Sequence, residues 1–466
     1  MKLFLAFLSL IVSLLSVAIH RFTLAFYPEI TCDADPPIEY EGYKNFKWNA
    51  CKVFSLEYKD AREKFVGLAK EKGAAEVISL PIGTDDYTID VAIFQGTRPG
   101  VILHTSGTHG IEGYAGSAIQ LAFLESMGSS LEKKEEEEGG RPTLILVHAM
   151  NPYGMANYRR FNEHNVDLNR NGIPDFPQFL MDRHPNIAGY DDFREFISPT
   201  HAPTKWESST LGFFASAIPL LAQHGYQTLK RVLVAGQYHH PQGVFYGGIE
   251  WEPSVVKLVQ FLESRQLWDD LLVHIDVHTG LGKFGKDTLM FADAPLMEDL
   301  DLHEVFPTAE SIVTPHVEDK KAMAGYDLTR GMLPRLIQHN VSNCLSLTQE
   351  FGTLPGVLVG RALILENAMH HHGDKKEDSN DQGRKWIQQA FYSQSTEWRA
   401  SIVQRGIAVM LQAIEYSKTI PILEREDPEP AANTSSSDGD LDDVQAEDDQ
   451  EEQEEAPVHE ETESAQ

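Results

Sequence analysis

The sequence is poor in cysteine, and this shortage excludes two classes of protein. Its 466 residues include three cysteines, Cys32, Cys51 and Cys344, and no Cys-x-x-Cys pair. Three cysteines cannot build a disulfide-rich scaffold, and the missing pair removes the usual thiolate metal site. Cys32 and Cys51 are near enough in sequence to pair in an oxidising compartment; two unpaired thiols are the alternative.

Positive charge is scarce as well. Lys and Arg number 39 against 70 Asp and Glu, which gives a formal net charge of −31 at pH 7. Residues 426–466 hold 17 of the acids and no Lys or Arg, so the other residues carry −14. Phosphate-backbone binding needs a basic surface, so we expect no nucleic acid among the partners. Segment 426–466 has few large apolar side chains to bury and is predicted to be an acidic disordered tail.

The longest apolar run lies at the beginning of the chain. It extends from Leu3 to Ile19 behind Lys2. This run is longer than a minimal signal-peptide core and a little short for a membrane span of about 20 residues. We therefore expect residues 1–25 to be a signal peptide or an uncleaved signal anchor. Either would take the protein into the secretory pathway, as a secreted or membrane-anchored protein.

Between these ends, strand-like and helix-like patterns alternate. Strands are expected at 77–82, 87–94, 101–104, 143–148, 231–235, 271–277, 288–291 and 344–348. Helices are expected at 38–72, 114–127, 209–224, 254–266, 357–371 and 383–416. This alternation predicts an α/β fold with a mixed, largely parallel twisted sheet and helices on both faces. In such sheets, ligands bind at the carboxyl ends of the strands.

Polar motifs follow four of the expected strands. They are HGIE at 109–112, RR at 159–160 with NVDLNRN at 165–171, DVHTG at 276–280, and EFGT at 350–353. Imidazole and carboxylate three residues apart suit Zn²⁺, and paired arginines beside an Asn suit recognition of a carboxylate. Each motif alone also has an ordinary structural explanation, such as a capping Glu beside a turn His. Four of them at one predicted sheet edge indicate a site.

The motifs also carry a resemblance to a known family. In kind and in order, His109-x-x-Glu112, Asp167-x-Asn169-Arg170, His278 and Glu350 resemble the zinc carboxypeptidase superfamily. That superfamily includes carboxypeptidase A and the aspartoacylase and succinylglutamate desuccinylase deacylases. The stretches HTSGTHGIEGYAGS, NEHNVDLNRN, DVHTGLG and QEFGT are similar to one poorly characterised carboxypeptidase-like branch of it. The resemblance implies a carboxypeptidase-like catalytic domain over residues 38–420.

The resemblance assigns a metal, its ligands and a base. It implies one Zn²⁺ per chain, held by His109, Glu112 and His278, with water in the open position. Glu350 would be the general base that takes the proton of the water and passes it to the leaving group. Asp167 would accept a hydrogen bond from the far nitrogen of His109 and so orient that ligand.

Further residues would bind the substrate. Arg160 would polarise the scissile carbonyl, with Arg159 as the alternative. Asn169 and Arg170 would bind a substrate carboxylate.

A tyrosine is also expected in the substrate site. Carboxypeptidases of this kind place a Tyr some two dozen residues before the base. Tyr326 stands about there in surroundings that match poorly, and Tyr246 competes with it. Each is also explained as a partly buried aromatic residue.

Together these residues predict a zinc-dependent hydrolase of an amide bond adjacent to a free carboxylate. The substrate would be a peptide that loses its C-terminal residue, or an N-acyl amino acid of the aspartoacylase type. The secretory start favours peptides slightly. From another class, a non-catalytic zinc-containing binding module is the alternative. A complete ligand set together with Glu350 favours the enzyme.

Overall fold

A computed structural model describes residues 48–127, 140–292, 300–314, 329–341, 344–374 and 379–420. The predicted signal segment, the predicted acidic tail and Tyr326 lie outside the described residues. Cys51 is disulfide-bonded, whereas Cys344 is free and buried. In the ranges given above, no helix combines the length and the apolar composition that a membrane crossing needs.

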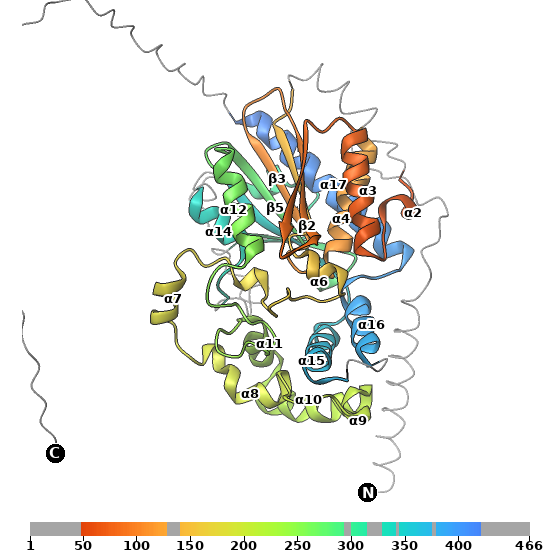
Figure 1. The fold of residues 1–466 in the computed structure, drawn as a ribbon, viewed down its shortest axis with the longest axis vertical. Helices are drawn as coiled ribbons and strands as arrows, with labels where there is room; N and C mark the ends of the chain where they lie inside the picture. The colour runs from red at the N-terminus through yellow and green to blue at the C-terminus, as the bar shows by residue number, and fades with distance from the viewer. Residues whose placement is uncertain are drawn as a thin grey trace, which may run out of the picture. The chain divides into compact units, whose positions relative to one another are not determined.

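One mixed sheet of eight strands forms the centre of the fold (Figure 1). The strand order is β1-β2-β4-β3-β5-β8-β6-β7. The strands are β1 (Glu76–Ile82), β2 (Thr84–Phe94), β3 (Val101–Ser106), β4 (Thr143–His148), β5 (Leu271–Phe284), β6 (Asp287–Phe291), β7 (Ile312–Val313) and β8 (Leu345–Gly352).

The four central strands, β4, β3, β5 and β8, are parallel to one another. Strands β1 and β2 extend one side with antiparallel pairings, and β6 joins β8 antiparallel on the other side. Every residue of β3 and β4 is buried, as expected for strands covered on both faces. The predicted mixed, largely parallel sheet is confirmed.

Helices cover both faces of the sheet, as predicted. On one face lie α2 (Ala50–Val53), α3 (Tyr58–Glu71), α4 (Gly113–Met127) and α17 (Thr396–Thr419); on the other lie α12 (Pro253–Ser264) and α14 (Leu333–Asn340) (Figure 1). The side chains of β3 alternate between these layers. Ile102 packs in the apolar cluster of α3, α4 and α17, whereas Val101 and Leu103 pack in the cluster of α12 and α14.

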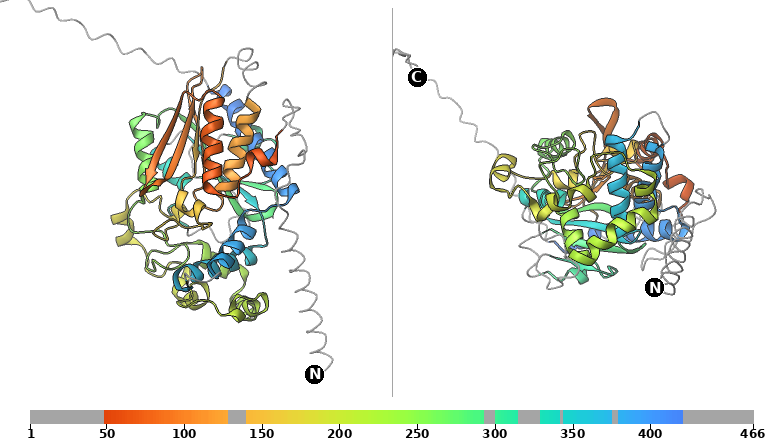
Figure 2. Two further views of the ribbon diagram at one scale, coloured as in Figure 1. Left: turned by 45° about the vertical axis from the view of Figure 1, so that its right-hand side comes forward. Right: turned by 90° about the horizontal axis from the view of Figure 1, so that it is seen from below.

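A group of helices lies beyond the carboxyl ends of the central strands. It is at the bottom of Figure 1 and of the left view of Figure 2, and the right view of Figure 2 shows it from below. Its members are α7 (Phe176–Asp182), α8 (Tyr190–Ile197), α9 (Lys205–Ser208), α10 (Thr210–His224), α11 (Tyr226–Val234), α15 (Gly356–His372) and α16 (Ser379–Phe391). We call this group the helical lobe. Its position places it directly over the edge of the sheet where the sequence predicts the site.

Three of the expected elements differ from the structure. The expected strand at 231–235 is the end of helix α11, because a short apolar run fits either period and only the preceding residues, from Tyr226, reveal the helix. The expected helix at 383–416 is two helices, α16 and α17. Ser395 caps the beginning of α17, because its side chain accepts a hydrogen bond from the backbone N–H of Trp398. One helix is expected at 38–72, but the described part of this range forms two separate helices, α2 and α3.

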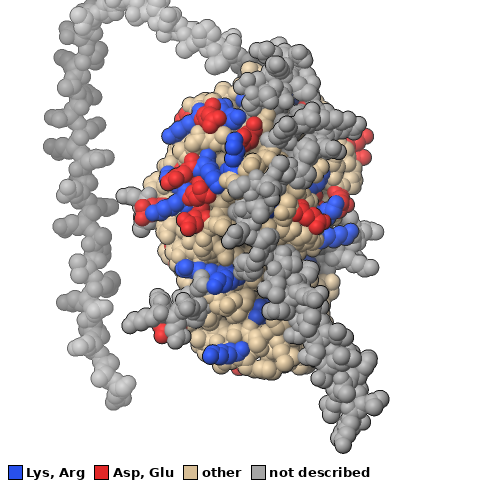
Figure 3. Space-filling view, turned by 90° about the vertical axis from the view of Figure 1, so that its right-hand side faces the viewer, with Lys and Arg blue, Asp and Glu red and all other residues tan. Residues whose placement is uncertain are grey.

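Charges of both signs are mixed on the face of the molecule seen in Figure 3. Helix α3 contributes one such pair, in which Lys64 Nζ lies 2.9 Å from Asp60 Oδ2. On this face, acidic and basic side chains lie beside one another.

Candidate active site

The turn between β3 and α4 carries two of the predicted metal ligands, His109 and Glu112. This turn packs closely against the segment after β4. A Cβ on Gly110 would lie 2.0 Å from the backbone carbon of Gly154, so the close approach requires glycine there. The backbone N–H of Ile111 also donates to the carbonyl of Arg159. The ligand turn is therefore held against the segment that carries the two arginines.

Two neighbouring strands carry the other predicted metal ligand and the predicted base. His278 on β5 and Glu350 on β8 are register partners in the parallel ladder. In parallel strands, register partners point to the same face of the sheet. Both residues therefore face the position of His109 and Glu112 from rigid elements rather than from loops.

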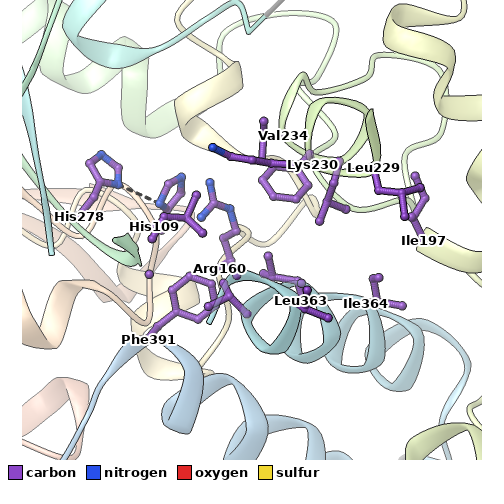
Figure 4. A pocket seen from close by; sticks show the side chains of 18 of the residues that line it. His109, Arg160, Ile197, Leu229, Lys230, Val234, His278, Leu363, Ile364 and Phe391 are labelled. Atoms are coloured by element: carbon purple, nitrogen blue, oxygen red, sulfur yellow. Dashed lines mark hydrogen bonds between the residues drawn. The ribbon is translucent and has the colours of Figure 1, made fainter. Parts of the chain in front are cut away.

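The three predicted ligands converge on one point. One donor atom from each of His109, Glu112 and His278 lies within 4.8 Å of the other two, and all three residues are buried. The two imidazole Nδ1 atoms are 2.9 Å apart (Figure 4), and Glu112 lies 2.9 Å from His109 Nδ1 and 3.1 Å from His278 Nδ1. These residues form a candidate three-ligand metal site.

The opposite nitrogen of each histidine faces a buried carboxylate. His109 Nε2 lies 3.1 Å from Asp167 Oδ1, and His278 Nε2 lies 2.7 Å from Asp276 Oδ2. Such a carboxylate leaves Nδ1 free of its proton and turns it towards a metal. Two imidazoles and one carboxylate, oriented in this way, match the donor set of catalytic zinc sites.

Both orienting carboxylates are themselves held in place. The hydroxyls of Thr105 and Thr108 donate to Asp276 Oδ1, at 2.7 and 2.8 Å. Burial alone would raise the pKa of Asp167, but the charge of Arg160 outweighs it and holds this pKa well below its ordinary value. Asp167 is therefore ionised throughout the physiological range.

The two arginines point to different parts of the molecule. The guanidinium of Arg160 donates to Asp167 Oδ2 at 3.0 Å and to Glu112 Oε1 at 3.1 Å. Arg159 instead donates to Glu366 Oε1 at 2.7 Å and to Asn165 Oδ1 at 2.9 Å. The structure thus brings Arg160 to the candidate metal ligands and buries Arg159 in a separate ion pair.

Glu350 stands beside the candidate metal site with a perturbed carboxyl group. Its Oε1 accepts a hydrogen bond of 2.8 Å from the backbone N–H of Leu281. Burial, together with the negative charge of Glu112, raises the pKa of Glu350 to about 7. A carboxylate whose pKa lies near neutrality can both accept and return a proton at that pH.

A large cavity extends from these residues into the helical lobe (Figure 4). It encloses about 1120 Å³, including the space at its mouth that is open to solvent. His109, Arg160, His278 and Glu350 form its polar end, and residues of α8, α10, α11 and α15 form the remaining wall. The candidate site is therefore the end of a deep, mostly apolar cavity.

The predicted carboxylate-binding pair, Asn169 and Arg170, also lines this cavity. Arg170 Nη2 donates to the carbonyl of Val234 at 2.6 Å, and Arg170 Nη1 donates to the carbonyl of Asn169 at 2.6 Å. The Asn169 side-chain oxygen accepts from the backbone N–H of Leu333 at 2.9 Å. Both polar side chains are thus fixed in position at the cavity wall by backbone groups.

The aromatic ring at this place in the cavity belongs to Phe245 rather than to the predicted Tyr246. Phe245 lines the cavity, and the guanidinium carbons of Arg160 and Arg170 lie 4.8 and 5.4 Å from its ring centroid. Tyr246 is buried, and its carbonyl accepts from the backbone N–H of Asp167. Phe245 has a φ of 55°, a strained conformation for a bulky side chain. This backbone turn decides which of the two rings faces the arginines.

Several residues of the site were missed by sequence reasoning. Asp276 stands two residues before His278 at a strand end, a signal that could have marked it as the partner of that histidine. The apolar wall gave no comparable signal, because its residues come from four helices far apart in sequence.

Three of the solved structures that are similar to this chain show the range of the likeness. Bovine thrombin-activatable fibrinolysis inhibitor, in complex with tick carboxypeptidase inhibitor, is 12% identical with a TM-score of 0.46, covering 79% of this chain and 100% of that one. A metallo-carboxypeptidase from Burkholderia cenocepacia is 13% identical with a TM-score of 0.38, covering 76% and 69% of the two chains. Carboxypeptidase A from Helicoverpa armigera is 14% identical with a TM-score of 0.38, covering 72% and 73%. The function proposed below rests on the geometry of the site and not on these likenesses.

No curated protein matches the chain. A family match covers residues 54–405, which include the candidate metal ligands, both arginines and Glu350. The chain belongs to the family DUF2817, described as a protein of unknown function.

Proposed function

We propose that this protein is a zinc-dependent hydrolase of an amide bond adjacent to a free carboxylate. The observation that carries the proposal is the convergence of His109, Glu112 and His278 within 4.8 Å at the polar end of a cavity, with Glu350 on the neighbouring strand. When bound there, zinc would supply Lewis acidity and lower the pKa of water to about 7.

The protein side chains would move the proton and hold the substrate. Glu350 takes a proton from the attacking water and returns it to the nitrogen of the leaving amine. The water thereby adds its hydroxyl to the acyl carbon, so that amide and water give a carboxylic acid and an amine. The hydrogen bond from Leu281 holds Oε1 of Glu350, and we assign the proton transfer to Oε2.

Arg160 is the residue that we assign to the carbonyl oxygen. Its guanidinium is anchored on Asp167 and Glu112 at the metal ligands and also lines the cavity. A donor fixed in advance stabilises the negative charge that develops on this oxygen. Arg170 lies next to the ring of Phe245, as Arg160 does, and Asn169 also lines the cavity; we assign the substrate carboxylate to Asn169 and Arg170.

The direct test is an assay of the zinc-loaded full-length protein. Blocked dipeptides with a free C-terminus and N-acyl amino acids form the two substrate sets. We expect zinc-dependent hydrolysis of at least one set and its loss in Glu350→Gln. Zinc binding without hydrolysis of either set would contradict the proposal and would favour a non-catalytic zinc-containing binding module.

A further inference from the structure

The cavity extends beyond the candidate reacting groups, and its far part is lined by apolar side chains. Residues of β5 and β8 line one end of it, and residues of α8, α10, α11 and α15 line the other. Figure 4 shows His109 and His278 at one end and Ile197 and Ile364 at the other. The cavity therefore leads from the reacting groups deep into the helical lobe.

The wall of the deep part is built from aliphatic and aromatic side chains. Helix α10 contributes Phe213, Ala217 and Leu221, and helix α15 contributes Leu363 and Ile364 among others. The lining residues extend from Phe213 to Leu221 on α10 and from Gly356 to Ile364 on α15, which is about 12 Å along each helix at 1.5 Å per residue. Such a wall stabilises a long apolar group by removing it from water.

The chemistry of the wall discriminates between a hydrocarbon chain and a peptide chain. Of the described lining residues that α8, α10, α11 and α15 contribute, Lys230 is the one with a charge and Tyr226 the one with a hydroxyl. Away from the helix ends, the backbone groups of these helices bond within the helices. A peptide laid along this wall would leave its own N–H and C=O groups unpaired, at a cost for each. A hydrocarbon chain has no such groups.

We infer that the substrate is an N-acyl amino acid, or a similar amide, whose acyl part is a long hydrocarbon chain. The acyl carbonyl meets Arg160 at the polar end, the carboxylate of the amine part meets Asn169 and Arg170, and the chain extends towards Ile197 and Ile364. This inference rests on the proposed function for the position of the reacting carbonyl. The expected affinity for the acyl chain depends only on the apolar lining of the cavity.

Binding can be measured without turnover. Zinc-loaded, full-length Glu350→Gln protein is titrated in a calorimeter with N-acyl glycines of 2, 6, 10 and 14 acyl carbons, below their critical micelle concentrations. Each buried methylene is expected to tighten binding about threefold to fourfold, so the step from six to ten carbons gives about 10²-fold. An affinity that does not rise beyond two carbons, or that is higher for dipeptides ending in Phe, would overturn the inference.

Substitutions at the far end of the cavity test where the chain lies. Ile364→Trp fills this end, so we expect at least tenfold weaker binding of the 14-carbon ligand and unchanged binding of the 6-carbon ligand. Ile218→Trp is the matched control, because Ile218 is 57% exposed on α10 and does not line the cavity. If Ile364→Trp does not fold, Ile197→Trp makes the same test. Equal loss for both ligands, or no loss for either, contradicts the assigned position.

The two proposals fail in different ways. Strong dependence of binding on chain length without hydrolysis by the wild-type protein would support the long-chain ligand and contradict the proposed hydrolase activity. Hydrolysis of N-acetyl amino acids or dipeptides, with binding that does not depend on acyl chain length, would support the hydrolase activity and contradict the long-chain ligand.

Discussion

His278 and Glu350 are register partners on the adjacent parallel strands β5 and β8. A candidate metal ligand and the proposed base therefore stand side by side on two central strands of the sheet. A substitution that leaves both strands intact can remove one function without the other.

Glu350→Gln is expected to lower the rate of hydrolysis by about 10²–10⁴-fold, because the amide cannot take a proton from water. Zinc content and thermal stability should remain at the wild-type level, since Glu350 is not one of the three converging ligands. Steady-state kinetics and metal analysis of the same sample check both parts. Retained activity at full zinc occupancy would rule out Glu350 as the base.

The pH profile of the wild-type protein is expected to have an acid limb set by Glu350. The general base must be ionised, so kcat/KM should fall about tenfold for each pH unit below its pKa. That pKa is raised to about 7 by burial and by the charge of Glu112, and the positive charge of a bound metal would lower it again. The limb is therefore expected at or below about pH 7. A rate that is constant between pH 5 and 8 would contradict this assignment.

Asp276→Asn is expected to weaken zinc binding by about 10–100-fold. The carboxylate accepts from His278 Nε2, so Nδ1 remains available to the metal, and an amide cannot hold this tautomer as strongly. Competition with a fluorescent zinc chelator measures the affinity. Thr108→Val, which removes one donor to Asp276, should have a smaller effect in the same direction. Unchanged affinity in Asp276→Asn would show that this carboxylate does not orient the ligand.

The two neighbouring arginines are expected to behave in opposite ways. Arg160→Lys should lower kcat by about 10²–10³-fold with little change in stability, because a lysine cannot reproduce its fixed donors.

Arg159→Met should instead destabilise the fold by about 3–5 kcal/mol, since it leaves Glu366 buried without its ion-pair partner. The double variant Arg159→Met with Glu366→Leu should recover much of this loss. Chemical denaturation and kinetics of the three variants separate the two roles. Loss of turnover in a folded Arg159→Met protein would reverse the assignment.

Buried neutral histidines are expected to make the fold sensitive to acid. Burial lowers the pKa of His104 and of His148 to about 4, against 6.5 for an unperturbed histidine. The unfolded chain therefore binds these protons at higher pH, and stability should fall as the pH drops from about 6.5 to about 4.

His148 offers the test, because its ring stacks on Phe65 and its Nε2 lies 3.0 Å from Ser117 Oγ. Between pH 7.5 and 4.5, the free energy of unfolding of His148→Gln should fall by about 2 kcal/mol less than that of the wild-type protein. Denaturant titrations at the two pH values measure this difference. An identical loss in variant and wild type would show that His148 does not titrate on unfolding.

Much of the fold could be predicted because its strands carry strong local signals. The runs at 143–148 and 271–277 are short, apolar and β-branched, and both are strands of the sheet. The run at 231–235 is also short and apolar but ends a helix, since a run of this length fits the period of either element. The domain limits at 38–420, the secretory location and the catalytic roles of the site residues remain predictions.

The sequence by itself determined the convergence of His109, Glu112, His278 and Glu350. Residues that end parallel strands of one sheet must meet at the same edge, whatever the details of packing. Only the tertiary structure decided between Arg159 and Arg160 and between Phe245 and Tyr246. Adjacent residues point in different directions, and the packing of distant segments selects which one faces the site. The apolar cavity is likewise a property of the tertiary structure alone, because four helices distant in sequence meet to form its wall.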